Sequence, residues 1–89
     1  MQTNIERGTR SEKTSTLSRF PDKLHGTVVD ITADGDLQCR LMGMGLFVGT
    51  RFQILQRGTK RSRIPFVIAI GETRIAVDSE IAEMILVES

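Results

Sequence analysis

The side chains that most often perform chemistry are scarce in this sequence of 89 residues. It has one histidine, His25, one cysteine, Cys39, and neither tryptophan nor tyrosine. A nucleophilic triad needs a nucleophile, a base and a group that orients the base, and no such third group is evident here. Gly43, Gly45 and Gly49 precede an expected strand rather than a helix, and no Lys-Ser or Lys-Thr pair follows them, so they do not form a phosphate-binding P-loop. We therefore expect no catalytic residues and no enzyme activity.

Potential metal ligands are also few. Transition-metal sites need clustered imidazole, thiolate or carboxylate groups. Asp34 and Asp36 form a close acidic pair, but a carboxylate in this position also suits the first turn of a helix, and we favour that interpretation. We expect Cys39 to be a small buried side chain and His25 to be solvated. The sequence therefore predicts neither a metal site nor a bound cofactor.

A binding role is indicated first by an apolar run at an expected turn. Leu46, Phe47 and Val48 follow one another there, and three consecutive side chains at a turn cannot all face the core. We expect Phe47 to be exposed, which is costly unless it contacts a partner; the alternative is that Phe47 covers the end of the fold. Arg40 is expected to point outward from the preceding helix.

The second binding feature is a basic segment. Residues 51–63 carry five basic side chains and no acidic one, whereas residues 72–89 carry five acidic side chains and only Arg74 as a base. A basic hairpin loop over residues 58–63 could dock on an acidic partner surface, where charge sets encounter rate and register; it could also be only a solvated tip. The candidate partner-binding residues are Arg40, Phe47, Lys60, Arg61 and Arg63.

The apolar residues define one small domain. Residues 1–16 contain only Met1 and Ile5 as apolar side chains, and such a segment cannot offset the entropy of ordering it. We therefore expect a disordered polar tail over residues 1–16 and a folded domain over residues 17–89. No apolar run approaches the ~20 residues that cross a bilayer, and a single cysteine excludes an internal disulfide, so we expect a cytoplasmic protein without membrane insertion.

Periodicity predicts the elements that carry these residues. Alternation predicts strands over residues 26–32, 52–57 and 73–78, and in the first it places Val28 and Ile31 on opposite faces. Residues 64–70 are apolar on both faces, which predicts the most buried strand, and residues 84–88 are expected to form the closing strand. Asp34 begins a short helix whose apolar stripe, Leu37, Leu41 and Met44, is expected to face the core. Gly45 is expected to end it, with Leu46 folding back on the last turn.

The spacing of these elements favours one architecture. The connections are too short for parallel crossovers, so the strands pair antiparallel. A small sheet with frequent glycines tends to curl and remove its edges. We therefore predict a mainly β fold: a small SH3-like antiparallel barrel of about five strands with a short helix between strands one and two.

The segment around the expected helix end resembles the FeoA family, small cytoplasmic accessory proteins of bacterial ferrous iron uptake. The resemblance covers residues 17–89. It is carried by the order and spacing of Arg40, Leu41, Met44, Gly45, Leu46 and Gly49, by Gly26, Val28 and Ile31 before them, and by Thr73, Ile75, Ala76, Ala82, Ile85 and Val87 after them.

The resemblance implies a non-catalytic accessory protein that binds the cytosolic part of the FeoB-type iron permease. Two alternatives stay open: a small-barrel nucleic-acid-binding module, and a metal-responsive regulatory SH3-like domain. The body of the chain has nine basic and nine acidic side chains, and this balance argues against nucleic acid as the partner. An open sheet edge would allow weak homo-oligomers.

Overall fold

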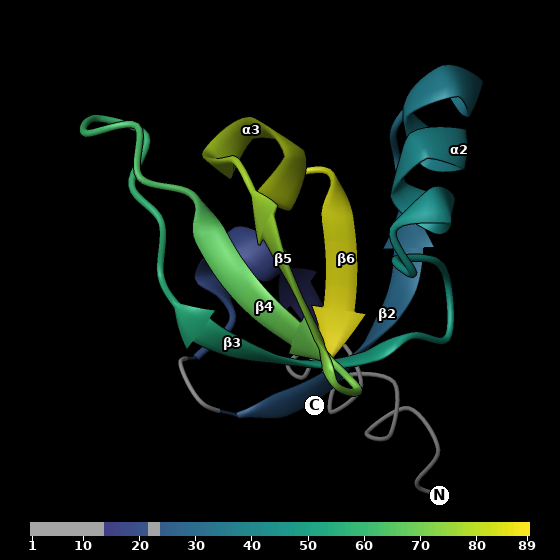
Figure 1. Cartoon of the computed structure of the whole chain (residues 1–89), viewed down its shortest axis with the longest axis horizontal. Coiled ribbons are helices and arrows are strands. Elements are labelled where there is room, and N and C mark those ends of the chain that lie inside the picture. The colour runs from purple at the N-terminus through teal and green to yellow at the C-terminus, as the bar shows by residue number, and fades with distance from the viewer. Residues whose placement is uncertain (1–13, 22–23) are drawn as a thin grey trace, which may run out of the picture.

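The computed structural model describes residues 14–21 and 24–89 of the chain. Within them lie six strands, a 3-10 helix and two short α-helices (Figure 1). In chain order these are β1 (Thr14–Thr16), η1 (Leu17–Arg19), β2 (His25–Ile31), α2 (Gly35–Gly43), β3 (Arg51–Gln56), β4 (Phe66–Ile70), β5 (Thr73–Val77), α3 (Ser79–Ala82) and β6 (Ile85–Glu88). The mainly β fold with a helix between two early strands is confirmed.

All strand pairs are antiparallel and belong to one curled sheet of order β1-β6-β2-β3-β4-β5. The sheet is consistent with a small SH3-like barrel, but it does not close, since β1 and β5 are its two ends. The strand count differs from the prediction because Thr14–Thr16, which we assigned to the polar tail, pair with β6 at the register Thr14 to Glu88. The rest of the expected tail, residues 1–13, lies outside the described residues.

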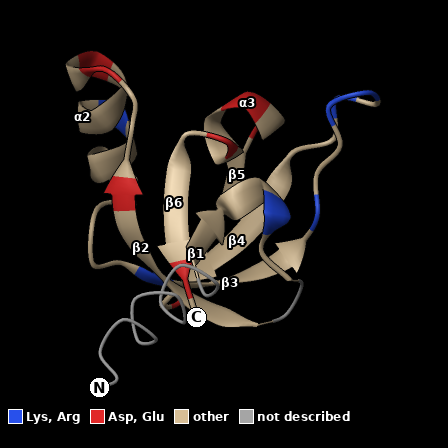
Figure 2. Ribbon diagram, turned by 180° about the vertical axis from the view of Figure 1, so that it is seen from behind, with Lys and Arg blue, Asp and Glu red and all other residues tan. Residues whose placement is uncertain are grey.

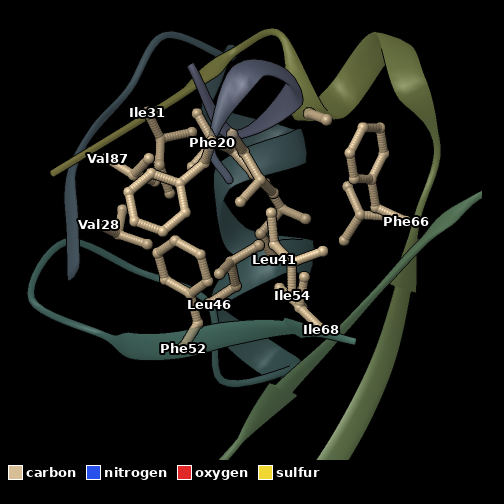
Figure 3. Close-up of a cluster of buried hydrophobic side chains, with 14 residues drawn as sticks. Phe20, Val28, Ile31, Leu41, Leu46, Phe52, Ile54, Phe66, Ile68 and Val87 are labelled. Atoms are coloured by element: carbon tan, nitrogen blue, oxygen red, sulfur yellow. The ribbon is translucent and has the colours of Figure 1, made fainter. Parts of the chain in front are cut away.

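One hydrophobic core fills the curl of the sheet (Figure 3). Fourteen buried side chains form it, and every described element except β1 contributes. They are Leu17, Phe20, Val28, Ile31, Leu41, Leu46, Phe52, Ile54, Phe66, Ile68, Val77, Ala82, Ile85 and Val87. The rings of Phe20 and Phe52 pack against each other at an interplanar angle of 57° with their centroids 5.3 Å apart. This separation lies in the range that aromatic pairs prefer.

The side chains of β2 that face the core differ from those that the alternation predicted. Val28 and Ile31 are both buried, although they stand three positions apart. The register of β2 against β6 shifts between Val28 and Asp30. A bulge of this kind adds one residue to one strand and reverses the alternation beyond it, which is why strict two-residue periodicity assigned these side chains to opposite faces.

Candidate partner-binding surfaces

Helix α2 is held at its start by two polar side chains. The Leu37 N–H donates to Oδ1 of Asp34 at 2.9 Å, so Asp34 is the N-cap, as predicted. The side-chain amide of Gln38 donates to the carbonyl oxygens of Ile31, at 3.2 Å, and Ala33, at 2.9 Å. These bonds anchor the first turn of α2 to the end of β2.

The end of α2 turns the chain by a Schellman motif. Gly45 has φ +94°, and its N–H donates to the Met42 carbonyl at 2.9 Å, while the Leu46 N–H reaches back to the Leu41 carbonyl at 2.9 Å. Glycine is favoured at this left-handed position because it has no Cβ. Leu46 is fully buried beside the core residue Leu41, which confirms the predicted fold-back.

The loop after Leu46 is fixed by the hydroxyl of Thr50. This residue is only 6% exposed. Its Oγ1 accepts from the Phe47 N–H and donates to the Gly45 carbonyl, both at 3.0 Å. With the backbone held in this way, Phe47 and Val48 project outward and are 44% and 59% exposed. The expected exposure of Phe47 is therefore confirmed.

Two further methionines extend this apolar surface. Met42 is 58% exposed and Met44 is 42% exposed. The prediction that Met44 packs in the core with Leu37 and Leu41 was wrong for Met44, because α2 ends at Gly43 and the cap residue no longer follows the helical stripe. Leu41 is buried, and Leu37 packs against the core.

Met42, Phe47 and Val48 border an open groove of about 330 Å³ beside α2. We call it the α2 groove; its lining is Ile31, Gln38, Met42, Leu46, Phe47 and Val48. Five of the six are apolar, and the amide of Gln38 already bonds to the backbone of β2 and the following turn. A groove of this kind can bind an apolar side chain or the apolar face of a partner segment.

The basic hairpin, residues 59–64, projects on the other side of α3 from α2 (Figure 1). Its base is closed by the Thr59 N–H to the Ile64 carbonyl at 2.8 Å and by the reverse bond at 3.0 Å. Lys60, Arg61 and Arg63 are exposed on it, and Figure 2 shows this tip as a blue segment that extends beyond the sheet. The loop predicted from charge is thus a real protrusion.

Gly58 fixes the direction of the hairpin. A Cβ at this position would lie 2.5 Å from the Ile64 carbonyl oxygen and 2.7 Å from the Phe66 backbone nitrogen. Both are backbone atoms that cannot move without opening the hairpin base. Only glycine permits this close approach of the two hairpin arms.

Arg57 of the same basic segment has a structural role. Its guanidinium donates to the carbonyl oxygens of Ser18 and Phe20 and lies 5.4 Å from the centre of the Phe66 ring. It thereby ties η1 and the following residue to β3 and β4. Within the basic segment, Arg57 thus packs on the body of the domain, whereas Lys60, Arg61 and Arg63 lie on the basic hairpin.

A cleft of about 430 Å³ separates the basic hairpin from α3. It is lined by Thr59, Lys60, Arg63, Ile64, Asp78, Ser79 and Glu80. Cations from the hairpin thus face carboxylates from the start of α3. Asp78 also caps α3, because its Oδ1 accepts from the Ile81 N–H at 2.9 Å.

The predicted binding residues form two surfaces rather than one. Lys60, Arg61 and Arg63 share the basic hairpin, and Phe47 borders the α2 groove. Arg40 is exposed on α2 but does not line the groove. The sequence analysis missed Met42 and Val48 as groove residues; the signal was the apolar run from Leu41 to Val48, which is too long for so short a helix to bury.

The potential metal ligands stay apart within the described ranges. No group of three His, Cys, Asp or Glu side chains there could hold a metal ion. His25 is exposed, as expected, and Asp34 is occupied as a cap. Cys39 is exposed on α2, so the expectation that it is buried was wrong: only one face of α2 touches the sheet.

A family model described as the FeoA domain matches residues 15–89. The chain belongs to the FeoA family. The match begins within β1 and includes the α2 groove, the basic hairpin and strands β2 to β6. No helix among the described residues is long and apolar enough to cross a membrane.

Solved structures agree with this assignment. The crystal structure of an iron uptake regulatory protein (FeoA) is 27% identical with a TM-score of 0.75, over 84% of this chain and 96% of that one. Iron(II) transport protein A from Clostridium thermocellum is 29% identical with a TM-score of 0.71, over 82% of this chain and 44% of that one. No curated protein matches the chain.

A manganese-dependent transcriptional repressor contains a similar domain. It is 25% identical with a TM-score of 0.74, over 85% of this chain but only 41% of the repressor. This FeoA-family chain therefore has the fold of one part of a larger metal-dependent regulator.

Proposed function

We propose that this FeoA-family protein is a non-catalytic cytoplasmic accessory protein of ferrous iron uptake that binds the cytosolic part of a FeoB-type permease. The observation that carries the proposal is the α2 groove with its exposed apolar rim. Family membership supplies the iron-transport context. The groove supplies a surface whose chemistry favours a protein partner.

The apolar rim is costly in the free protein. Phe47, Val48 and Met42 are each more than two-fifths exposed, and water contact with apolar area costs roughly 25 cal/mol per Å². The loop is nonetheless held open by the buried Thr50 hydroxyl. Stable exposure of clustered apolar side chains marks an interaction site, and methionines adapt well to a partner surface.

The basic hairpin gives the second part of the interface. Lys60, Arg61 and Arg63 extend away from the core on a loop whose base is closed by the bonds between Thr59 and Ile64. Cations at the rim of an interface raise the association rate and orient the partner. We assign affinity to the α2 groove and steering to the basic hairpin.

The apolar contribution is tested by Phe47→Ala in the full chain, with binding to the purified cytosolic part of the permease measured by calorimetry. We expect about a tenfold or greater loss of affinity, as for an aromatic anchor at an interface. Leu55→Ala is the matched control, because Leu55 is 39% exposed on β3 and does not line the groove. Equal affinity of the Phe47 variant and the native chain would refute the groove as the site.

The electrostatic contribution is tested by Lys60→Glu. We expect a slower association rate and a weaker dependence of that rate on salt, because exposed charges are screened within about 10 Å at 0.1 M salt. Arg19→Glu reverses a charge on η1 and serves as the control. If both charge reversals slow association equally, net charge rather than the hairpin is responsible.

A second candidate, a metal-responsive regulatory domain, is favoured by the likeness to the manganese-dependent repressor. In that role the same groove would bind a segment of a regulator rather than of a permease. Binding of the permease part in the absence of any metal would favour the first proposal; a strict requirement for added Mn²⁺ would favour the second.

The nucleic-acid alternative receives less support. The hairpin cations Lys60 and Arg63 share their cleft with Asp78 and Glu80, whose carboxylates would repel phosphates. The hairpin also lacks an aromatic side chain on which a base could stack. Salt-dependent RNA binding, abolished by Lys60→Glu, would reverse this ranking.

A further inference from the structure

Two of the exposed side chains at the end of α2 carry a thioether sulfur. Met42 lines the α2 groove and is exposed, whereas Met44 is exposed but does not belong to the lining. Met84, the remaining methionine of the described residues, is half-buried. Peroxides oxidise methionine to its sulfoxide, which turns an apolar side chain into a polar one. In the described part of the chain this reaction is least obstructed at Met42 and Met44, and only the first of these sulfurs belongs to a groove residue.

The side chains of the groove offer no hydrogen-bond donor to a sulfoxide oxygen. Among the described residues that line the groove, Gln38 alone has a polar side chain. Its amide nitrogen has two N–H groups, and it donates to the carbonyl oxygens of Ile31 and Ala33. The amide oxygen that remains is an acceptor, as is the oxygen of a sulfoxide. A Met42 sulfoxide that a partner covers therefore loses its bonds to water without a side-chain replacement, which is unfavourable.

We propose that Met42 is a peroxide-sensitive switch of the α2 groove: the thioether form binds an apolar partner, the sulfoxide form binds it more weakly, and reduction restores binding. This inference rests on the proposed function, because it concerns the partner that occupies the groove. Met44 undergoes the same oxidation without this consequence, since its sulfoxide lies outside the groove lining and stays in contact with water.

The oxidation transfers one oxygen atom to the Met42 sulfur. A lone pair of Sδ attacks the terminal oxygen of a hydroperoxide, so that an S–O bond forms while the O–O bond breaks. The sulfur loses two electrons and the peroxide gains them. The proton of the transferred oxygen moves to the departing oxygen, which leaves as water from hydrogen peroxide or as an alcohol from an organic hydroperoxide. A methionine sulfoxide reductase reverses the change: two thiols supply two electrons by forming a disulfide, and the oxygen leaves as water.

The selectivity of the oxidation is tested without a partner. Because Cys39 is an exposed thiol that peroxide also attacks, the full chain carries Cys39→Ser. Peptide mass spectrometry then follows the formation of each sulfoxide during treatment with hydrogen peroxide. We expect Met42 and Met44 to be oxidised at least about threefold faster than Met84, in line with their exposure. Oxidation of Met84 as fast as that of Met42 would overturn the proposal.

The effect on the groove is tested by calorimetry with the cytosolic part of the permease, in the same Cys39→Ser chain. Each protein is compared with its own untreated form, and circular dichroism checks that the treated forms stay folded. We expect peroxide to weaken binding about tenfold when Met42 is present, including in Met44→Leu, and to leave the affinity of Met42→Leu at its untreated value. Methionine sulfoxide reductase with dithiothreitol should restore binding. An equal loss of affinity in Met42→Leu, or no loss in the chain that keeps Met42, would overturn the proposal.

A neutral apolar dye separates this inference from the proposed function, because it probes the groove without the permease. Nile red, whose fluorescence rises in an apolar site, should bind more weakly after peroxide treatment, and Met42→Leu should abolish this response. If the dye responds in this way and the permease part does not bind at all, the proposed function fails and the switch stands. If the permease part and the dye both bind the oxidised chain as well as the untreated one, the switch fails and the proposed function stands.

Discussion

The residues that shape the binding surfaces are mostly not the ones that would touch a partner. Phe47 is exposed because Thr50 is buried and bonds to both sides of the loop. Lys60 and Arg63 project because Gly58 allows the hairpin arms to approach. At this scale the shape of the candidate surfaces depends on small or polar residues that hold larger neighbours in place.

Thr50→Val should destabilise the loop while preserving side-chain shape. The Phe47 N–H and the Gly45 carbonyl would lose their common partner, a loss that costs about 1–3 kcal/mol for buried groups. Urea unfolding should show this decrease in the free energy of unfolding, and the Phe47 amide should exchange faster with solvent. Thr50→Ser keeps the hydroxyl and should restore slow exchange; fast exchange in the serine variant would contradict the assigned bond.

Arg57→Ala should destabilise the whole domain, although the residue is exposed. The substitution removes the bonds to the Ser18 and Phe20 carbonyls and the contact with the Phe66 ring, and we expect a loss of about 1–3 kcal/mol. Arg61→Ala is the matched control, because Arg61 lies at the exposed hairpin tip. Equal unfolding midpoints for the two variants would show that Arg57 does not hold η1 to the sheet.

At the scale of elements, helix α2 decides where the groove lies. Its first turn is tied to β2 by Gln38, and its last turn is closed by the Schellman motif at Gly45. Between these two anchors only Leu41 is fully buried. A helix of nine residues is marginal on its own, so its caps add to the stability that the packing of Leu41 supplies.

Asp34→Ala should therefore loosen α2 more than the rest of the fold. Loss of an N-cap typically costs about 0.5–2 kcal/mol, and we expect amide exchange to increase in residues 35–43 before it increases in the sheet. Asp36→Ala removes a carboxylate in the same turn that does not cap the helix and serves as the control. Uniformly faster exchange across the sheet would mean that α2 does not open independently.

At the scale of the whole molecule, the domain is an open sheet around one core. Among the described residues its two end strands differ: β1 pairs with β6, whereas β5 has a strand beside it on one side, β4. The molecule thus presents two separate candidate surfaces, namely the α2 groove and the basic hairpin. A protein without a predicted catalytic site can act through several contacts at once.

The domain boundary can be tested by two truncations. Removal of residues 1–13 should leave the unfolding midpoint unchanged, in keeping with the expected polar tail. Removal of residues 1–16 also deletes β1 and its pairing with Leu86, Val87 and Glu88; it should lower the free energy of unfolding by about 1–3 kcal/mol, as backbone bonds of β6 lose their partners. Identical free energies of unfolding for the two truncated chains would show that Thr14–Thr16 do not stabilise the fold and belong to the polar tail.

The sequence by itself determined the features that depend on near neighbours. Alternation and apolar runs located β2 to β6 along the chain, Asp34 marked the start of α2, and Gly45 with Leu46 marked its end. Caps and turns involve residues within about five positions of one another, so their chemistry can be recognised without knowledge of the fold. The exposure of Phe47 followed from the same local reasoning, since one turn cannot bury three apolar side chains.

Only the tertiary structure decided what depends on distant partners. Thr14–Thr16 form a strand because Leu86–Glu88 lie beside them, and their polar composition alone indicated a tail. The bulge between Val28 and Asp30 follows from the pairing of β2 with β6. Met44 is exposed because α2 ends at Gly43, and Cys39 is exposed because little of α2 meets the sheet. The physical reason is common to all of them: burial and strand pairing are properties of contacts between segments far apart in the chain, and no local period encodes them.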